Sequence, residues 1–163
     1  MNKRIFYLDN GKPRLVIPAP SNRQFKTHRE ETDDEFIDRI RRKDVPTTAT
    51  DVQIVDVSEL PEETVTAWPI FFTAWRPVDG QIVIDMPKAR NVWRDKIRDA
   101  RKPLLDALDI EYQHADERGD AEEKQAIAAR KQALRDAPTN PRIEAAVTIK
   151  ALKDVWPLPV TES

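Results

Sequence analysis

Residues 87–156 carry an apolar repeat that strongly limits how this part of the chain can fold. Apolar residues recur three or four positions apart, which is the spacing of one helix face. The residues of this stripe are Trp93, Ile97, Ala100, Leu104, Leu108, Tyr112 and Ala115. Pro103 falls inside the stripe and should kink the helix rather than end it. Gly119 suits the position just after a helix C-terminus, so the repeat predicts one long helix that ends there.

A second helix should begin at once, because Asp120 is followed by two glutamates that favour a helix N-terminus. It should end before Pro138, and a short terminal helix should close before Trp156. At about 1.5 Å per residue the first helix spans roughly 47 Å and the second about 25 Å. The second helix is therefore too short to cover the whole apolar stripe of the first.

The first half of the chain has signals for short strands and one helix. Asn10-Gly11 lies between two apolar runs and is a strong hairpin signal, because both residues tolerate positive φ. Thr32 and Glu35 have the spacing of a capping box, and the helix that they start should end before Pro46. These patterns predict an antiparallel hairpin followed by a helix.

Residues 51–57 alternate well enough to form another strand. Val52 and Ile54 are expected to face inward, with Val55 as a further inward candidate. The chain should turn at Asp79-Gly80 and continue into a strand over residues 82–84. We therefore predict an α+β fold. A small α+β domain with short antiparallel strands spans residues 1–85, and a helical hairpin domain with a short terminal helix spans residues 86–163.

Composition and charge exclude several classes of function. The chain has no cysteine, so disulfides, thiolate metal sites and cysteine nucleophiles are excluded. Its three glycines do not match any glycine-rich phosphate loop. The formal net charge of −2 gives no general attraction to nucleic acid. No signal peptide or membrane span is visible, so a soluble protein of a reducing compartment is expected.

The side chains that could perform chemistry are scattered. His28 and His114 have no metal-binding spacing, and no serine has the context of a hydrolase nucleophile. The acidic run at residues 33–35 lies at an expected helix start, where negative charge is stabilising anyway. We therefore expect no catalytic residue, no cofactor and no metal. A nucleic-acid binder that uses the basic residues 39–43 and 88–102 stays open as a weaker alternative.

The long helix is polarised. Seven basic residues lie between Lys88 and Lys102, whereas eight acidic residues lie between Asp106 and Glu123. One interpretation is electrostatic alignment with an oppositely charged partner. The other is a solvated face with charge pairs within the helix.

The candidate partner-binding residues are aromatic or lie on the apolar stripe. Trp93, Ile97 and Leu104 belong to the part of the stripe that the second helix does not reach. Trp68 and Trp75 flank two phenylalanines, and each would anchor a partner if it stayed exposed. The uncovered stripe could be covered by the α+β domain, a second copy of the chain or a partner protein.

Several stretches resemble the tail-fibre assembly chaperones of tailed bacteriophages. They are residues 93–101, residues 128–138 with the sequence AARKQALRDAP, and Trp156-Pro157, with further similarity at residues 43–61 and 86–90. The resemblance implies a non-enzymatic helper that binds the C-terminal region of a trimeric fibre in the host cytoplasm and can remain on the tail of the virion. A permanent structural component of the virion, such as a baseplate, neck or fibre-linking protein, is the alternative. Neither role involves nucleic acid or a membrane, and self-association is compatible with both.

Overall fold

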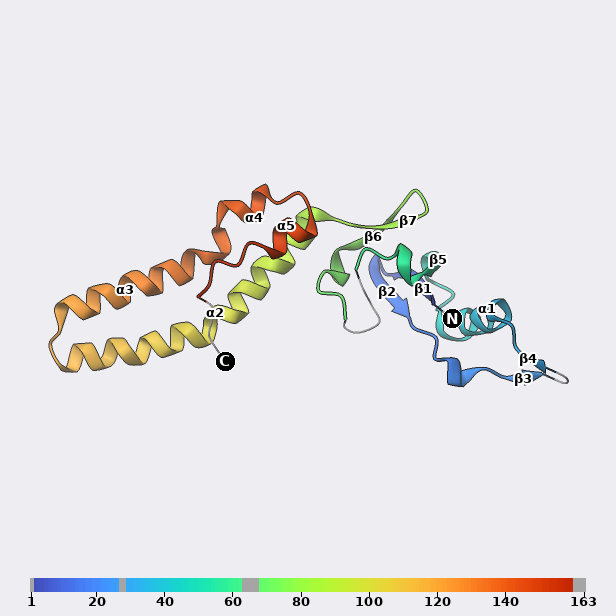
Figure 1. Cartoon of the computed structure of the whole chain (residues 1–163), viewed down its shortest axis with the longest axis horizontal. Coiled ribbons are helices and arrows are strands. Elements are labelled where there is room, and N and C mark those ends of the chain that lie inside the picture. The colour runs from blue at the N-terminus through green and yellow to red at the C-terminus, as the bar shows by residue number, and fades with distance from the viewer. Residues whose placement is uncertain (1, 27–28, 63–67, 160–163) are drawn as a thin grey trace. The chain divides into compact units, whose positions relative to one another are not determined.

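The computed structural model describes residues 2–26, 29–62 and 68–159 and confirms the predicted α+β class. The chain divides into two compact units, Met1–Asp85 and Met86–Ser163. The boundary lies at the position expected from the sequence. Short strands and one helix build the first unit, whereas helices build the second (Figure 1).

A three-stranded antiparallel sheet with the order β2-β1-β5 is the centre of the first unit. Its strands are β1 (Lys3–Asp9), β2 (Lys12–Val16) and β5 (Thr50–Asp56). The predicted turn joins β1 to β2, with φ of 49° at Asn10 and 72° at Gly11. Positive φ at both central residues matches the right-handed twist of the two strands.

The sheet separates two apolar clusters. On one side Ile5 packs with Phe36, Ile37 and Ile40 of helix α1 (Asp33–Asp44). Both halves of the predicted capping box form: Thr32 Oγ1 accepts from Glu35 N at 3.3 Å, and Thr32 N donates to Glu35 Oε2 at 2.9 Å. The helix ends two residues before Pro46, as predicted.

On the other side of the sheet Phe6 and Val55 pack with Phe72, Trp75 and Ile82. The last two come from a second hairpin, β6 (Trp75–Val78) and β7 (Gln81–Ile84). Its turn has positive φ at Asp79 and Gly80, as the sequence indicates. A short β3–β4 pair (Phe25–Lys26 and Arg29–Glu30) and the 3-10 helices η1 (Pro20–Asn22), η2 (Val57–Glu59) and η3 (Phe72–Ala74) complete the described part of this unit.

The predicted orientation of β5 is wrong for Val52 and Ile54 and right for Val55. Val55 is buried, whereas Val52 and Ile54 are exposed. The reason is the register, in which Gln53 lies opposite Phe6 and Val55 opposite Arg4. Two residues of β5, Asp51 and Val52, then face the single β1 residue between Phe6 and Leu8, which is a β-bulge. Asp51 has a positive φ of 53°, as the first residue of a G1-type bulge has.

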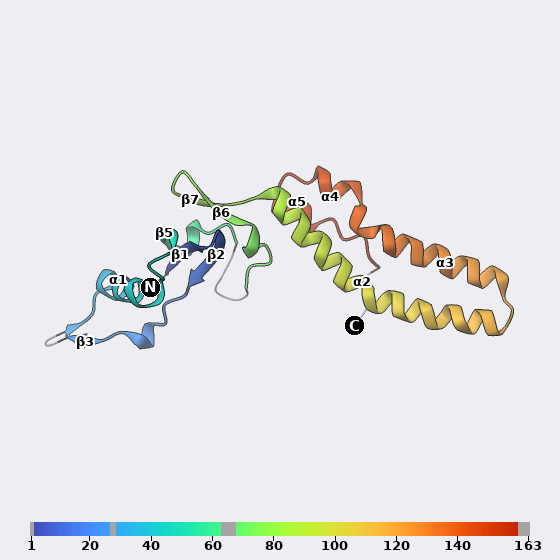
Figure 2. The same ribbon diagram turned by 180° about the vertical axis from the view of Figure 1, so that it is seen from behind.

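The second unit is the predicted helical hairpin followed by short helices (Figure 2). Helix α2 (Met86–Glu117) continues through Pro103, and α3 (Ala121–Asp136) returns beside it. Between them Gly119 has φ of 68°, and the Asp120 carboxylate accepts from Glu123 N at 2.9 Å. The 3-10 helix η4 (Ala137–Thr139) and helices α4 (Pro141–Ala145) and α5 (Ile149–Lys153) follow.

Candidate partner-binding surfaces

The predicted docking face on the first half of α2 is closed by the chain itself. The side chains of Trp93 and Ile97 are only 5% and 0% exposed. The segment after η4 returns along α2, so that Trp93 Nε1 donates to the carbonyl oxygen of Val155 at 2.8 Å. The rings of Trp93 and Trp156 meet edge to face, with centroids 5.5 Å apart. The expectation that Trp93 and Ile97 remain available to a partner is therefore wrong.

The prediction failed because the segment that packs on this face of α2 is not a second long helix. Residues 146–159 include one short helix and otherwise irregular backbone, yet they bury several apolar side chains. These are Ala146, Leu152, Val155 and Leu158. A comparison of helix lengths overlooks such a segment, because its apolar residues have no clear period.

The basic half of α2 binds groups within its own unit. Arg94 pairs with Glu144 of α4 at 2.5 Å, and Arg90 pairs with the same carboxylate at 3.3 Å. The hydrogen bond from Arg94, together with both positive charges, holds the pKa of Glu144 below its ordinary value. Arg90 also donates to the carbonyl oxygen of Ala146 at 3.0 Å. These contacts hold the returning segment against α2.

The C-terminal end of α3 takes a further basic residue of α2. Arg101 donates to the carbonyl oxygen of Leu134 at 3.1 Å and also reaches that of Arg135. Carbonyl groups at a helix C-terminus lack partners within the helix, so a guanidinium group satisfies them well. Arg101 thus links the basic half of α2 to the C-terminal end of α3.

The acidic half of α2 pairs with basic residues of α3. Arg130 contacts Glu111 at 2.9 Å, and Lys131 forms an ion pair with Asp109. Lys124 pairs with Asp116 in the same way. The ammonium groups of Lys124 and Lys131 also lie 5.5 and 5.3 Å from the centre of the Tyr112 ring. The oppositely charged neighbour of this half is therefore α3.

Leu104 is the only one of the three predicted α2 residues that keeps partial exposure. It lies at a groove of about 340 Å³ between α2, α3 and the end of the described chain. The lining is mostly apolar: Leu104, Ala107, Leu108, Glu111, Arg130, Ala133, Leu134, Pro157 and Pro159. This groove is what remains accessible of the predicted face.

The two candidate tryptophans of the first unit differ. Trp75 is buried, and its Nε1 donates to Glu62 Oε2 at 3.3 Å, so its assignment as a partner anchor is wrong. Trp75 starts β6 and points into the core beneath the sheet. Trp68 is 59% exposed and touches the Phe72 ring edge to face, with centroids 4.8 Å apart. Trp68 therefore remains a candidate contact.

A second groove of about 720 Å³ lies between β5 and β7. It is lined by residues of both strands and by η2: Gln53, Ile54, Val55, Glu59, Gly80, Gln81 and Ile82. Gln53 Oε1 is buried there without a hydrogen-bond donor among the residues that the structure describes. Sequence reasoning did not find this site, because it placed Ile54 in the core.

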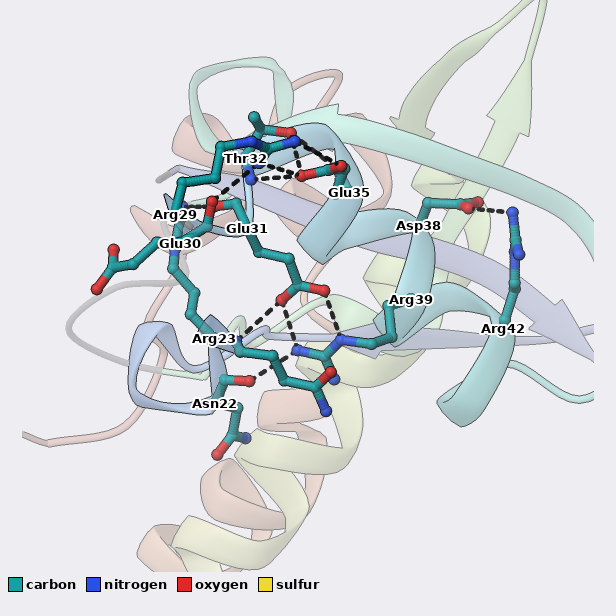
Figure 3. A network of polar contacts seen from close by, with 11 residues as sticks. Asn22, Arg23, Arg29, Glu30, Glu31, Thr32, Glu35, Asp38, Arg39 and Arg42 are labelled. Atoms are coloured by element: carbon teal, nitrogen blue, oxygen red, sulfur yellow. Dashed lines mark hydrogen bonds and ion pairs between the residues drawn. The ribbon is translucent and has the colours of Figure 1, made fainter. Parts of the chain in front are cut away.

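A polar network holds the segment before α1 against that helix (Figure 3). The Glu31 side chain is almost fully buried and binds the Arg39 guanidinium through both oxygens, at 2.7 and 2.8 Å. Its Oε2 also accepts from Gln24 N at 3.1 Å. The guanidinium carbons of Arg23 and Arg39 each lie 5.4 Å from the centre of the Phe36 ring. This network explains Glu31 and Arg39 as structural residues.

The other basic residues near the end of α1 have acidic neighbours too. Asp38 pairs with Arg41 at 2.8 Å and with Arg42 at 2.5 Å, and Lys43 lies 3.7 Å from Asp44. The hydrogen bond from Arg41 is the main cause that lowers the pKa of Asp38. The residues of the predicted basic patch thus interact with carboxylates of α1 itself or of the segment just before it.

Potential metal-ligating side chains stay dispersed in the described residues. Within residues 2–26, 29–62 and 68–159, no three His, Cys, Asp or Glu side chains come together as a metal ion would need. His114 is exposed on α2, and His28 lies outside the described residues. No helix in the described ranges combines the length and apolar character needed to cross a bilayer.

Comparison with family models, curated proteins and solved structures finds no match for this chain.

Proposed function

We propose that the chain is a non-enzymatic assembly chaperone for the tail fibre of a tailed bacteriophage. It acts in the host cytoplasm, where it binds the C-terminal region of the fibre before the trimer closes. The resemblance of residues 93–101, 128–138 and 156–157 to that family motivates the proposal. Those residues lie in the helices and returning segment of the second unit, so the resemblance concerns the framework of that unit.

The observation that supports a binding role is the exposed strand β5 in the first unit. Val52 and Ile54 are exposed on it, and β1 is its only strand neighbour in the described part of the chain. An incomplete fibre exposes strand edges and apolar interfaces that aggregate when they stay unpaired. A chaperone with an open strand edge of its own can cover such surface reversibly. The binding surfaces that we propose are therefore β5 and Trp68 in the first unit and, independently, the Leu104 groove in the second, instead of the buried Trp93 and Ile97.

Co-expression with the fibre protein of the same phage tests this role. The yield of soluble fibre trimer, measured by size-exclusion chromatography with light scattering, should fall when the chain is omitted. The control is co-expression with an unrelated small protein, which should not restore the yield. An unchanged trimer yield without the chain would contradict the chaperone role.

Purified particles separate this role from the alternative. A permanent component of the baseplate, neck or fibre junction would be present in every virion at a fixed number of copies. A chaperone that leaves would be missing, and one that stays would follow the copy number of the fibre. Quantitative mass spectrometry of purified virions measures this ratio.

A further inference from the structure

The two edges of the β2-β1-β5 sheet are built differently. β2, on one edge, carries Lys12, Pro13 and Arg14. Lysine, arginine and proline on an edge strand discourage pairing with another chain. β5, on the other edge, has none of these residue types between Thr50 and Asp56. Only the bulge at its start interrupts that edge.

Backbone groups in the middle of β5 point away from the sheet. Val57 N donates to the carbonyl oxygen of Asn2 at 2.8 Å, and bonded pairs alternate along an antiparallel ladder. Val55 and Gln53 are therefore the β5 residues that bond to β1, whereas Ile54 and Asp56 direct their N–H and C=O groups outward. Asp56 N donates to Glu59 Oε2 at 2.9 Å, in agreement with this alternation.

The backbone N–H and C=O of Ile54 have no hydrogen-bond partner among the described residues. Its side chain is 43% exposed. An exposed edge of this kind is a template for one more strand.

The groove beside β5 suits the side chains of such a strand. Gln53 and Val55 lie on the same side of the sheet as Phe6, and with Ile82 they line the groove. Side chains of an added strand would alternate between this groove and the opposite side, next to Ile54.

The charges around β5 indicate what kind of segment binds. Glu59 is the only charged residue that lines the groove. Two further carboxylates are exposed: Asp51 near the start of β5 and Asp79 in the turn between β6 and β7. No ion pair involves these three residues within the described chain. Lys3, on the neighbouring strand β1, forms its ion pair with Asp34 at 3.0 Å. A second copy that paired through its own β5 would bring the same carboxylates together, which is unfavourable.

We propose that the open edge of β5 and the adjoining groove bind an extended segment of a different protein that alternates apolar residues with lysine or arginine. The segment adds a fourth strand to the sheet and bonds to the backbone of Ile54. The link to the fibre rests on the proposed function, whereas the chemistry of the edge does not depend on it.

Two substitutions in the full-length chain test the site. Ile54→Pro removes the outward N–H without removing a bond to β1, because proline is tolerated on a free edge. Ile54→Lys adds the type of residue that already protects β2. Ile17→Lys is the matched control, since Ile17 is 45% exposed and lies outside β5. Circular dichroism and melting curves select the variants that keep the fold.

The probe is a labelled synthetic peptide of about eight alternating valines and lysines, a usual strand length. Binding is followed by fluorescence anisotropy at low and high salt, and the Ile54 amide by hydrogen exchange. We expect Ile54→Pro to weaken binding about tenfold, because it removes one hydrogen-bond donor to the peptide. Ile54→Lys should weaken binding by a similar factor, because its charge repels the lysines of the peptide. Ile17→Lys should change it less than about twofold. The wild-type Ile54 amide should exchange more slowly with peptide bound, and a glutamate-for-lysine peptide should bind more weakly.

Three outcomes would overturn the site: equal binding by the Ile54 variants, equal binding of the glutamate peptide, or a wild-type dimer that Ile54→Pro abolishes. The last outcome would make a second copy the occupant. Fibre co-expression separates this proposal from the chaperone role. If peptide binding fails but trimer yield still requires the chain, only the strand site is wrong; if the peptide binds as expected but trimer yield is unaffected, only the chaperone role is wrong.

Discussion

At the scale of single residues, Trp93 shows how one indole fixes the position of a distant segment. Its ring is buried on α2, and its Nε1 donates to the carbonyl oxygen of Val155, 62 positions further along the chain. Irregular backbone such as that around Val155 must find partners for its own polar groups. The indole supplies one of them, so Trp93 contributes both apolar area and a specific polar contact.

Replacement of Trp93 by phenylalanine should therefore destabilise the chain. Phenylalanine keeps an aromatic ring but leaves the Val155 carbonyl without its donor, which costs about 1–3 kcal/mol. Trp156→Phe is the control, because that ring is partly exposed and its indole N–H has no partner in the described chain. Urea unfolding followed by circular dichroism measures both variants. Equal losses for the two would show that the Val155 contact is unimportant.

At the scale of elements, the charge polarity of α2 selects its neighbours in space. Its basic half holds α4 through Glu144 and the end of α3 through backbone carbonyls. Its acidic half faces the lysines and arginines of α3. A helix hairpin with little apolar area can slip along its axis, and opposite charges penalise a shifted arrangement. The two charged halves of α2, which could indicate an external partner, thus pair with groups of the same unit.

Reversal of one charge pair tests this role. Lys131→Glu should place a second carboxylate beside Asp109 and lower the free energy of unfolding by about 0.5–1 kcal/mol. Asp109→Lys combined with Lys131→Glu should recover most of that loss, because attraction is restored in the opposite sense. Thermal melts of the single and double variants measure the coupling energy. No recovery in the double variant would argue against alignment of the hairpin by charge.

At the scale of the whole molecule, the chain consists of two units, each with buried residues of its own. The first has apolar clusters on both sides of its sheet. The second buries residues contributed by α2, α3 and the returning segment. Units of about 80 residues are long enough to fold by themselves, although their stability is modest.

Separate expression should therefore give two folded fragments. A fragment of residues 86–163 should keep its helical circular dichroism signal. It should melt within about 5 °C of the corresponding transition in the full chain, a difference of about 1 kcal/mol or less. Residues 1–85 should likewise keep dispersed methyl resonances by NMR. A fragment that aggregates or loses its signal would show that the unit needs its neighbour in the chain.

Features that depend on residues within about four positions of one another could be predicted from the sequence. The Asn10-Gly11 turn, the Thr32–Glu35 capping box and the break between α2 and α3 at Gly119 are of this kind. The α+β class followed from the order of these local signals. In each case the conformation is decided by backbone geometry and nearby hydrogen bonds.

Which surfaces remain open depends on how distant segments pack, and local patterns do not reveal it. The register between β5 and β1 buries Val55 on the Phe6 side and leaves Ile54 exposed, although alternation alone places Ile54 inside. The non-periodic residues 146–159 pack on Trp93, and Ile97 is buried too, although a comparison of helix lengths leaves both exposed. Exposure depends on contacts between residues far apart in the chain, and many such contacts are compatible with one local pattern. The helices and turns could therefore be predicted, whereas the binding surface had to be read from the fold.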